Sequence, residues 1–245
     1  MSRAEVILSL DCSTLTLSLA LLRPDRTPIE ERRIGPPQRQ SEVLPGEIQK
    51  ILSAHDVTLK QVTGFVLGLG PGSFTGLRIG LATMKGLSYA LKIPIAGVSS
   101  LAAIALEGPE GVELSCAAVV KKGELYLGRY RREGQGVVAL GPEQALTLSD
   151  FAAEVLRHPG LVLGPAIADY AERLEALGVP RERLQASPLF PSAVCLARLA
   201  KLPSAFEPTA MFALEPHYLR SSGAEDNPKF PPLPGPIPNS RLKED

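Results

Sequence analysis

The chain has no excess of either charge, since 26 acidic residues balance 26 basic ones among 245. This balance argues against a surface dedicated to nucleic acid, which requires clustered basic residues. No apolar run approaches the roughly 18 residues of a membrane helix, and no basic-then-apolar leader precedes Val6. The sequence therefore predicts neither membrane spanning nor secretion.

Cysteine is scarce, and the three present are Cys12, Cys116 and Cys195. They form no CxxC pair, their number is odd, and each lies among apolar neighbours. Such isolated cysteines are typical of buried, reduced thiols rather than of a disulfide framework. We therefore expect a cytoplasmic protein.

The common motifs of catalysis and metal binding are also missing. The three histidines fit neither HxxxH nor HExxH spacing, so we expect no metal site. The run around Ser73 reads GPGSF, which is not the GxSxG of serine hydrolases. Neither GK[ST] nor GxGxxG occurs in the glycine-rich stretch. The residues alone therefore indicate no assembled active site.

The most informative stretch is Gly64–Leu101. A short apolar run, Phe65–Leu69, predicts a buried strand. Gly70-Pro71-Gly72 then forces a turn, and helical spacing of apolar residues predicts a helix over Ser73–Leu91. A glycine turn before a helix N-terminus is also typical of phosphate binding. We therefore take Gly72 and Ser73 as candidate phosphate ligands.

Asp11 and Ser13 follow the first predicted strand and are two further candidates for a nucleotide site. In a kinase-like protein, Asp11 would hold a metal–phosphate complex. The alternative is that its carboxylate closes an Asx turn between two strands. The residues leave both interpretations open.

The helix contains Gly76 and Gly80, which lie four residues apart and so share one face. Glycine inside a helix costs about 1 kcal/mol relative to alanine. We therefore expect a structural or functional reason for the two glycines on this face. One interpretation is that the face packs on the protein's own sheet. The other is that it admits a partner helix or a ligand.

The element order predicts an α/β protein. Strands are expected at Val6–Leu10, Leu15–Leu22 and Ile29–Ile34, followed by alternating helices and strands. This is the order of the ribonuclease H-like fold, and the second half repeats it more faintly. Two tandem copies form the plan of the actin, sugar-kinase and Hsp70 superfamily. We expect lobes at 1–108 and 109–220, with the last helical part able to pack back on the first lobe.

The remaining segment, 221–245, has six prolines and few apolar residues. This composition predicts a disordered, proline-rich tail.

Several runs resemble the TsaB (YeaZ) family, whose members act in making threonylcarbamoyladenosine in tRNA. The run at Gly70–Leu87, GPGSFTGLRIGLATMKGL, is long and specific. Asp11–Thr14 is similar to the family's DTS-type opening, Lys121–Tyr126 to its second-lobe hairpin, and Pro216–Arg220 to its PxYLR ending. One departure is Val119-Val120-Lys121, where the family often has an aspartate.

The resemblance implies a noncatalytic scaffold without a cofactor of its own. Members form homodimers or pair with the catalytic subunit TsaD through first-lobe helices, and the ATPase TsaE joins that pair. ATP or ADP at the heterodimer interface is one expectation, and tRNA would be reached only through the complex. The helices expected to carry the partner interface span Ser41–Ala54 and Ser73–Leu91. The residues assigned to it are Leu44, Glu47, Ile48, Gly76, Arg78, Ile79, Gly80 and Thr83.

Comparison with TsaD-like proteins adds one further expectation. They carry a metal-binding histidine pair in a run like VNHLEGH, and this chain has Ser100 and Ile104 at those positions. An isoleucine side chain cannot ligate a metal ion. Two alternatives to the scaffold remain at this point: an ATP-using phosphotransferase built on Asp11 and, least favoured, a peptidase.

Overall fold

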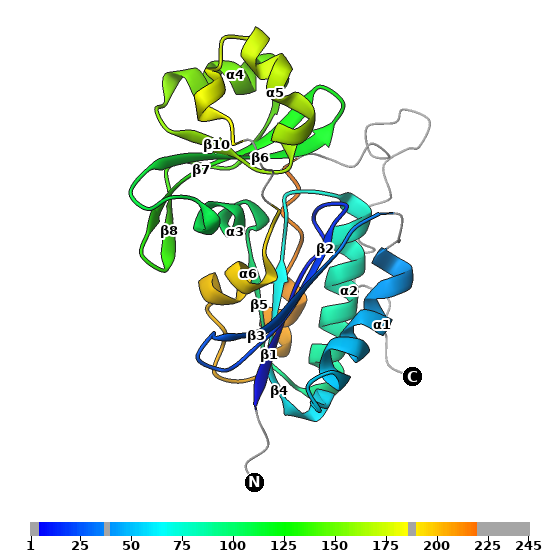
Figure 1. The fold of residues 1–245 in the computed structure, drawn as a ribbon. Coiled ribbons are helices and arrows are strands. Elements are labelled where there is room, and N and C mark those ends of the chain that lie inside the picture. Colours follow the sequence, from blue (N-terminus) through cyan, green and yellow to red (C-terminus); the bar gives the residue numbers. More distant parts are fainter. Residues whose placement is uncertain (1–4, 37–39, 186–189, 220–245) are drawn as a thin grey trace, which may run out of the picture.

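The computed structural model describes residues 5–36, 40–185 and 190–219, which build two sheets, each packed with helices (Figure 1). The strands of the first sheet are β1 (Val6–Asp11), β2 (Leu17–Leu22), β3 (Pro28–Ile34), β4 (Val62–Gly68) and β5 (Ile95–Val98). Their order is β3-β2-β1-β4-β5. The first three are antiparallel, and β4 and β5 run parallel to β1. This is the ribonuclease H-like order that the sequence predicts.

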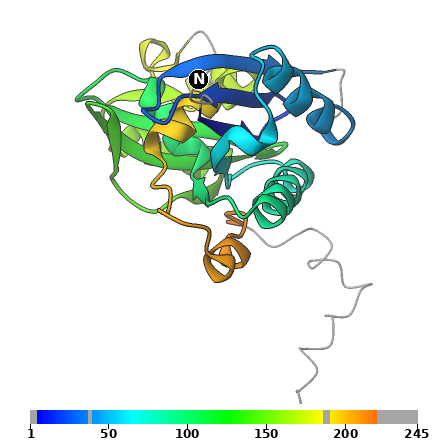
Figure 2. The same ribbon diagram turned by 90° about the horizontal axis from the view of Figure 1, so that it is seen from below.

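Helices cover both faces of the first sheet. On one face lie α1 (Gln40–Ser53) and α2 (Phe74–Leu91), and on the other lie α3 (Ser100–Glu107) and α6 (Ala193–Leu199) (Figures 1 and 2). Successive side chains of a strand point to opposite faces. Leu8 of β1 accordingly joins the apolar cluster under α1 and α2, whereas its neighbour Ile7 joins the cluster under α3 and α6.

The second sheet is a shorter copy of the first. Its strands are β6 (Glu113–Lys121), β7 (Glu124–Glu133), β8 (Gly136–Ala139), β9 (Gln144–Thr147) and β10 (Leu161–Leu163). Their order is β10-β6-β7-β8, and β9 also pairs with β7. Because β8 and β9 pair with successive parts of β7, together they occupy the place that β3 has in the first sheet.

Two helices, α4 (Leu148–Arg157) and α5 (Ala166–Ala176), cover one face of the second sheet. The other face packs on α3, which also contacts the first sheet. Leu101 and Ile104 of α3 face the second sheet, and Ala103 faces the first. One apolar helix thus joins the two lobes.

The chain then returns to the first lobe. Helix α6 packs on β1, β2 and β4, and α7 (Pro208–Ala213) packs on α2. Two short 3-10 helices, Leu59–Gln61 and Arg181–Arg183, complete the structure. Within the described residues, no helix has the length and apolar character needed to cross a membrane.

Most predicted elements are confirmed within a few residues. The second strand begins at Leu17 rather than Leu15, whose side chain is 76% exposed in the turn after β1. Strand β9 and helix α7 escaped the prediction. The three cysteines are buried free thiols, and burial raises the thiol pKa of Cys195 to about 11. The predicted tail, 221–245, lies outside the described residues.

Candidate functional site

Helix α2 is fixed at both ends. The Ser73 hydroxyl accepts a hydrogen bond from the Gly76 N–H at 3.2 Å, which makes Ser73 the N-cap. Lys92 ends the helix in the left-handed conformation, with a φ of 56°. The Ser73 side chain therefore fixes the start of the helix. Between its two ends, α2 has three sides with different surroundings.

The inner side of α2 contains Gly76 and Gly80, and both are buried. A Cβ added to Gly80 would lie 3.2 Å from the Cys12 Sγ and 3.4 Å from Leu67. The expectation that these glycines admit a partner helix is therefore corrected. Of the two interpretations, packing on the sheet is the one that the structure shows.

A second side of α2 is covered by the C-terminal segment of the chain itself. The Arg78 Nε donates to the Tyr218 hydroxyl at 3.0 Å, and its guanidinium lies 3.8 Å above the Phe74 ring. The Lys85 Nζ donates to the Phe212 carbonyl at 3.0 Å. Arg78 was predicted to lie at the partner interface, and the structure places it in contacts within the chain.

The third side of α2 is exposed and carries small side chains. Thr75, Ala82, Gly86 and Ala90 are exposed, and Ile79 beside them is half-buried. A Cβ added to Gly86 would meet no atom of the described residues within 4 Å. The sequence analysis missed this stripe, although the spacing of Ala82, Gly86 and Ala90 by four residues could have indicated it.

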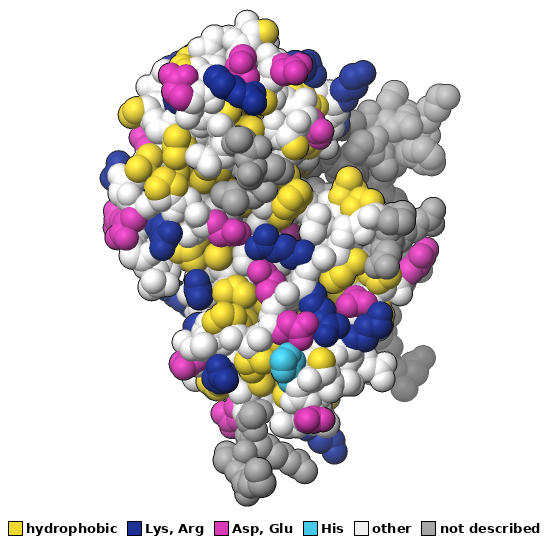
Figure 3. All heavy atoms as spheres, in the orientation of Figure 1, with side chains coloured by type: hydrophobic (Ala, Val, Ile, Leu, Met, Phe, Trp, Pro, Cys, Tyr) yellow, Lys and Arg dark blue, Asp and Glu magenta, His cyan; other side chains and the backbone are white. Residues whose placement is uncertain are grey.

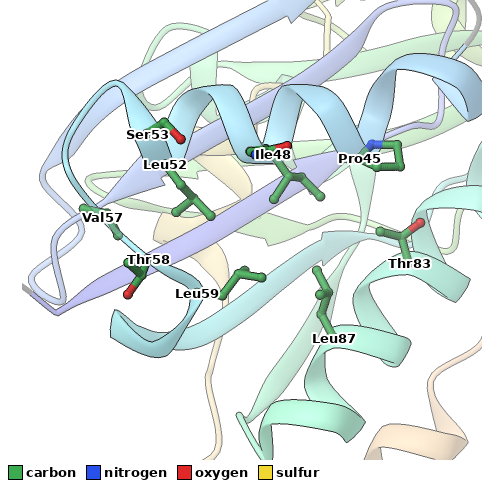
Figure 4. A pocket seen from close by; sticks show the side chains of 10 residues that line it. Pro45, Ile48, Leu52, Ser53, Val57, Thr58, Leu59, Thr83 and Leu87 are labelled. Carbon is green, nitrogen blue, oxygen red and sulfur yellow. The ribbon is translucent and has the colours of Figure 1, made fainter.

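An apolar groove of about 500 Å³ lies between α1 and α2, next to the small-residue stripe (Figure 4). Ile48 and Leu52 of α1 line one wall, and Thr83 and Leu87 of α2 line the other. The groove is also lined by Pro45, Gln49, Ser53, Val57, Thr58 and Leu59. Ile48, Ile79 and Thr83, all predicted interface residues, therefore lie in or beside one continuous surface.

The other two predicted residues of α1 have different surroundings. Leu44 is fully buried in the core of the first lobe. Glu47 accepts a hydrogen bond from the Lys50 Nζ at 2.7 Å and lies 3.6 Å from an Arg32 nitrogen. The hydrogen bond from Lys50 is the main cause that lowers the pKa of Glu47. The Leu44 side chain thus packs α1 onto the core of the first lobe. Glu47 remains charged and forms its contacts with Lys50 and Arg32.

The four candidate phosphate residues come together between β1 and the glycine turn. Asp11 is fully buried, and its Oδ1 accepts from the Ser13 N–H at 2.8 Å and the Ser13 hydroxyl at 2.7 Å. Its Oδ2 accepts from the Ser100 hydroxyl at 2.6 Å. Burial raises the pKa of Asp11, and these hydrogen bonds oppose the rise. This is the Asx-turn geometry of the alternative interpretation.

The glycine turn packs directly on the β1–β2 turn. The Ser73 N–H donates to the Ser13 carbonyl at 2.7 Å. A Cβ added to Gly72 would lie 2.1 Å from that same carbonyl oxygen. Gly72 is thus required for a close approach of two backbones, and the polar groups of Asp11, Ser13 and Ser73 form hydrogen bonds within the chain.

Comparison with known proteins adds the decisive observation. The chain is 31% identical to the TsaB protein of Bacillus subtilis, named for tRNA threonylcarbamoyladenosine biosynthesis, over 89% of this chain and 96% of that protein. This chain belongs to the TsaB family. It is also 33% identical to the TsaB protein of Escherichia coli, over 54% of this chain and 57% of that protein. The family model described as TsaD, tRNA N6-adenosine threonylcarbamoyltransferase, matches residues 37–225.

Solved structures agree with this assignment. YeaZ from Pseudomonas aeruginosa aligns with a TM-score of 0.67 at 29% identity, over 80% of this chain and 90% of that one. A second structure, an uncharacterized protein with similarity to peptidase YeaZ from Pseudomonas aeruginosa, aligns with a TM-score of 0.72. That alignment, at 26% identity, covers 88% of this chain and 100% of the other. The two-lobed fold is therefore shared along most of the chain.

The positions compared with the TsaD histidine pair lie on α3, Ser100 at its start and Ile104 in its middle. The Ser100 hydroxyl donates to Asp11 and accepts from the Gly70 N–H at 3.2 Å. Ile104 is fully buried between the lobes. In the described part of the chain, no three His, Cys, Asp or Glu side chains are grouped to hold a metal ion.

The PxYLR-like ending of this TsaB-family chain bridges the two lobes. Glu143 of the second lobe accepts a hydrogen bond from Tyr130 of the same lobe and another from Ser99 of the first lobe. Its other oxygen lies 3.1 Å from the His217 Nδ1, and the His217 N–H donates to the Leu69 carbonyl at 2.7 Å. Sequence reasoning did not single out Glu143, because contacts between the two lobes leave no local pattern.

Proposed function

We propose that this chain acts in tRNA threonylcarbamoyladenosine biosynthesis as a noncatalytic scaffold that binds a TsaD-type threonylcarbamoyltransferase. The names of its TsaB relatives and its match to the TsaD family model support the pathway. The proposed binding site is the docking surface, which we define as the α1–α2 groove together with the exposed stripe of α2. The stripe consists of Thr75, Ile79, Ala82, Gly86 and Ala90.

The observation that carries the proposal is Gly86. A glycine in an exposed helix position costs about 1 kcal/mol relative to alanine. Among the described residues there is no packing reason for it, because an added Cβ would meet none of their atoms within 4 Å. Small side chains let a second helix approach to the short end of the usual 8–10 Å range. A partner helix on this stripe would account for Gly86, Ala82 and Ala90 together.

The apolar groove strengthens this choice of surface. Ile48, Leu52 and Leu87 line it (Figure 4). Its lining residue Thr83 directly follows Ala82 of the stripe on α2, so the groove and the stripe adjoin. The covered flank of α2, with Arg78 and Lys85, is already occupied by the C-terminal segment. The same docking surface would serve the homodimer, so self-association and TsaD binding exclude each other. TsaE would join the pair with TsaD, and tRNA would reach the chain through that complex.

The test of the docking surface is a titration of the chain with its cognate TsaD, followed by light scattering. Gly86→Arg should weaken both the homodimer and the TsaD complex at least tenfold, since the long side chain separates the helices. Gly86→Ala is the matched control at the same position, and Ala139→Arg on the exposed strand β8 controls for added charge. Wild-type association of Gly86→Arg with both partners would rule out this surface.

The noncatalytic role needs a separate measurement. tRNA modification is reconstituted with TsaD alone, with this chain alone and with both together. We expect product to require TsaD and its rate to rise when the chain is added. Product formed by the chain without TsaD would contradict the proposed role while leaving the docking surface intact.

A further inference from the structure

A cavity on the opposite face of the first sheet from the docking surface contains two arginine side chains. It measures about 370 Å³ and is lined by Asp25, Arg26, Thr27, Pro28, Gln135 and Arg198. These residues come from the β2–β3 turn, the first residue of β3, the β7–β8 turn and α6. Figure 1 shows α6 between β8 and the β2–β3 hairpin on one side of the molecule. We call this cavity the arginine pocket.

The backbone at Arg26 is strained. Its φ is 72°, in the left-handed region where glycine or asparagine is usual. The turn is closed by the Arg23 N–H donating to the Thr27 carbonyl and the Arg26 N–H donating to the Arg23 carbonyl, both at 2.9 Å. Strain of this kind clusters at ligand-binding positions, where the side chain is required despite its backbone cost.

The two guanidinium groups lack the partners that arginines usually have. Among the described residues, neither Arg26 nor Arg198 forms an ion pair or a side-chain hydrogen bond, and the Arg26 Nη1 is buried without a partner. By contrast, Arg183 donates to three backbone carbonyls. Burial also lowers the pKa of Arg26 because it disfavours the charged form. A bound anion would stabilise that charged form.

The acid in the pocket does not neutralise these charges. The Asp25 Oδ1 accepts from the Thr27 N–H at 2.9 Å. The hydrogen bonds from Thr27 are the main cause that lowers the pKa of Asp25. The positive charge that lowers it further is that of Arg23 rather than that of Arg26. Half-buried Arg26 and exposed Arg198, which have no ionic partner among the described residues, therefore line one cavity.

We propose that the arginine pocket binds a phosphate group. Guanidinium groups present planar N–H donors that match phosphate oxygens, and charge-assisted hydrogen bonds of this kind are strong. The Gln135 amide supplies further N–H donors at the rim. The cavity has room for a phosphate group with several waters, each of which takes about 30 Å³. The phosphate is either free or part of an RNA backbone.

The binding test uses calorimetry with inorganic phosphate at low ionic strength. Arg26→Gly and Arg198→Gln should each weaken phosphate binding at least tenfold. Arg23→Gln is the matched control, because Arg23 lies in the same turn but outside the pocket lining. Arg26→Gly should also fold at least as stably as the wild type, since glycine relieves the left-handed backbone. No binding by the wild type, or an equal loss in Arg23→Gln, would overturn the proposal.

A second arm identifies the source of the phosphate. Filter binding with a tRNA transcript at the same ionic strength compares the wild type with Arg26→Gly and Arg198→Gln. Parallel loss of tRNA and phosphate binding would assign the pocket to the RNA backbone, and loss of phosphate binding alone to a free phosphate. TsaD titration should be unchanged in both variants, because α6 and α1 lie on opposite faces of the sheet. Phosphate binding at the arginine pocket is therefore tested independently of TsaD binding at the docking surface.

Discussion

Two glycines of helix α2 have opposite surroundings. Gly80 lies on the inner side, where a single added carbon would press on Cys12 and Leu67. Gly86 lies on the outer side, where the same carbon would meet open space. The inner glycine is explained by packing within the chain, and the outer one is not. Comparing them separates the requirements of the fold from those of a partner.

The remaining flank of α2 sharpens this comparison. There Phe74, Arg78 and Tyr89 are exposed as helix positions but contact the C-terminal segment. The Phe74 ring lies 5.3 Å from the Tyr218 ring, and the Tyr89 ring lies 5.8 Å from the Phe212 ring. On helix α2, the described part of the chain thus leaves the stripe around Gly86 and the adjoining groove uncovered.

The largest effect is expected for Gly80→Arg. The side chain would place an unpaired charge between α2 and the sheet, and we expect a loss of about 4 kcal/mol or more in the free energy of unfolding. Urea denaturation followed by circular dichroism measures this loss. Gly86→Arg is the matched variant and should unfold within about 1 kcal/mol of the wild type. Equal stability of the two variants would remove the distinction between the faces.

The next effect concerns Asp11, which lies next to Cys12 beneath α2. Burial raises its pKa above the unfolded value, so the folded state binds the proton more tightly. Its stabilising contribution is therefore complete below the unfolded pKa and is lost as pH rises through the folded pKa. Each unit of the rise corresponds to about 1.4 kcal/mol.

Asp11→Asn removes this titration and serves as the reference. The free energy of unfolding of the wild type, relative to that of Asp11→Asn, should fall as pH rises from about 4. Urea denaturation across a pH series measures the difference. A difference that rises with pH would mean that the hydrogen bonds from Ser13 and Ser100 outweigh burial.

The covered flank of α2 should respond more weakly. Tyr218→Ala removes the ring contact with Phe74 and the hydrogen bond from Arg78, and we expect a loss of about 1 kcal/mol in stability. Tyr218→Phe keeps the ring and should lose about half as much. TsaD binding should stay within about twofold in both variants. A tenfold loss would place the flank inside the docking surface.

The sequence predicted most of the first lobe because its signals are local. A compact apolar run marks β1, an apolar run between two glycines marks β4, and Ser73 with the preceding turn marks the start of α2. The four-residue strand β9 and the six-residue helix α7 carry too little periodicity to be recognised. Each is held by a distant partner, β7 or α2.

The site was harder to predict than the fold. Spacing places Gly76 and Gly80 on one face but does not say which face is turned to the sheet. That depends on Cys12, which directly follows β1, and on Leu67 of β4. The Glu143 contacts with Ser99 and His217 likewise join segments far apart in the chain. Such contacts are set by tertiary packing and leave no trace in a single sequence.

The smallest effect, and the most direct comparison, comes from replacing each glycine by alanine. Gly86→Ala should raise the free energy of unfolding by about 0.5–1 kcal/mol, since alanine favours the helix and its methyl group meets open space. Gly80→Ala gains the same helix preference, but its methyl group would lie 3.2 Å from the Cys12 Sγ, so overpacking offsets or exceeds the gain. Urea denaturation of both variants under one condition gives the difference. A larger stabilisation from Gly80→Ala than from Gly86→Ala would mean that the inner face has room for a side chain, and that packing does not explain its glycines.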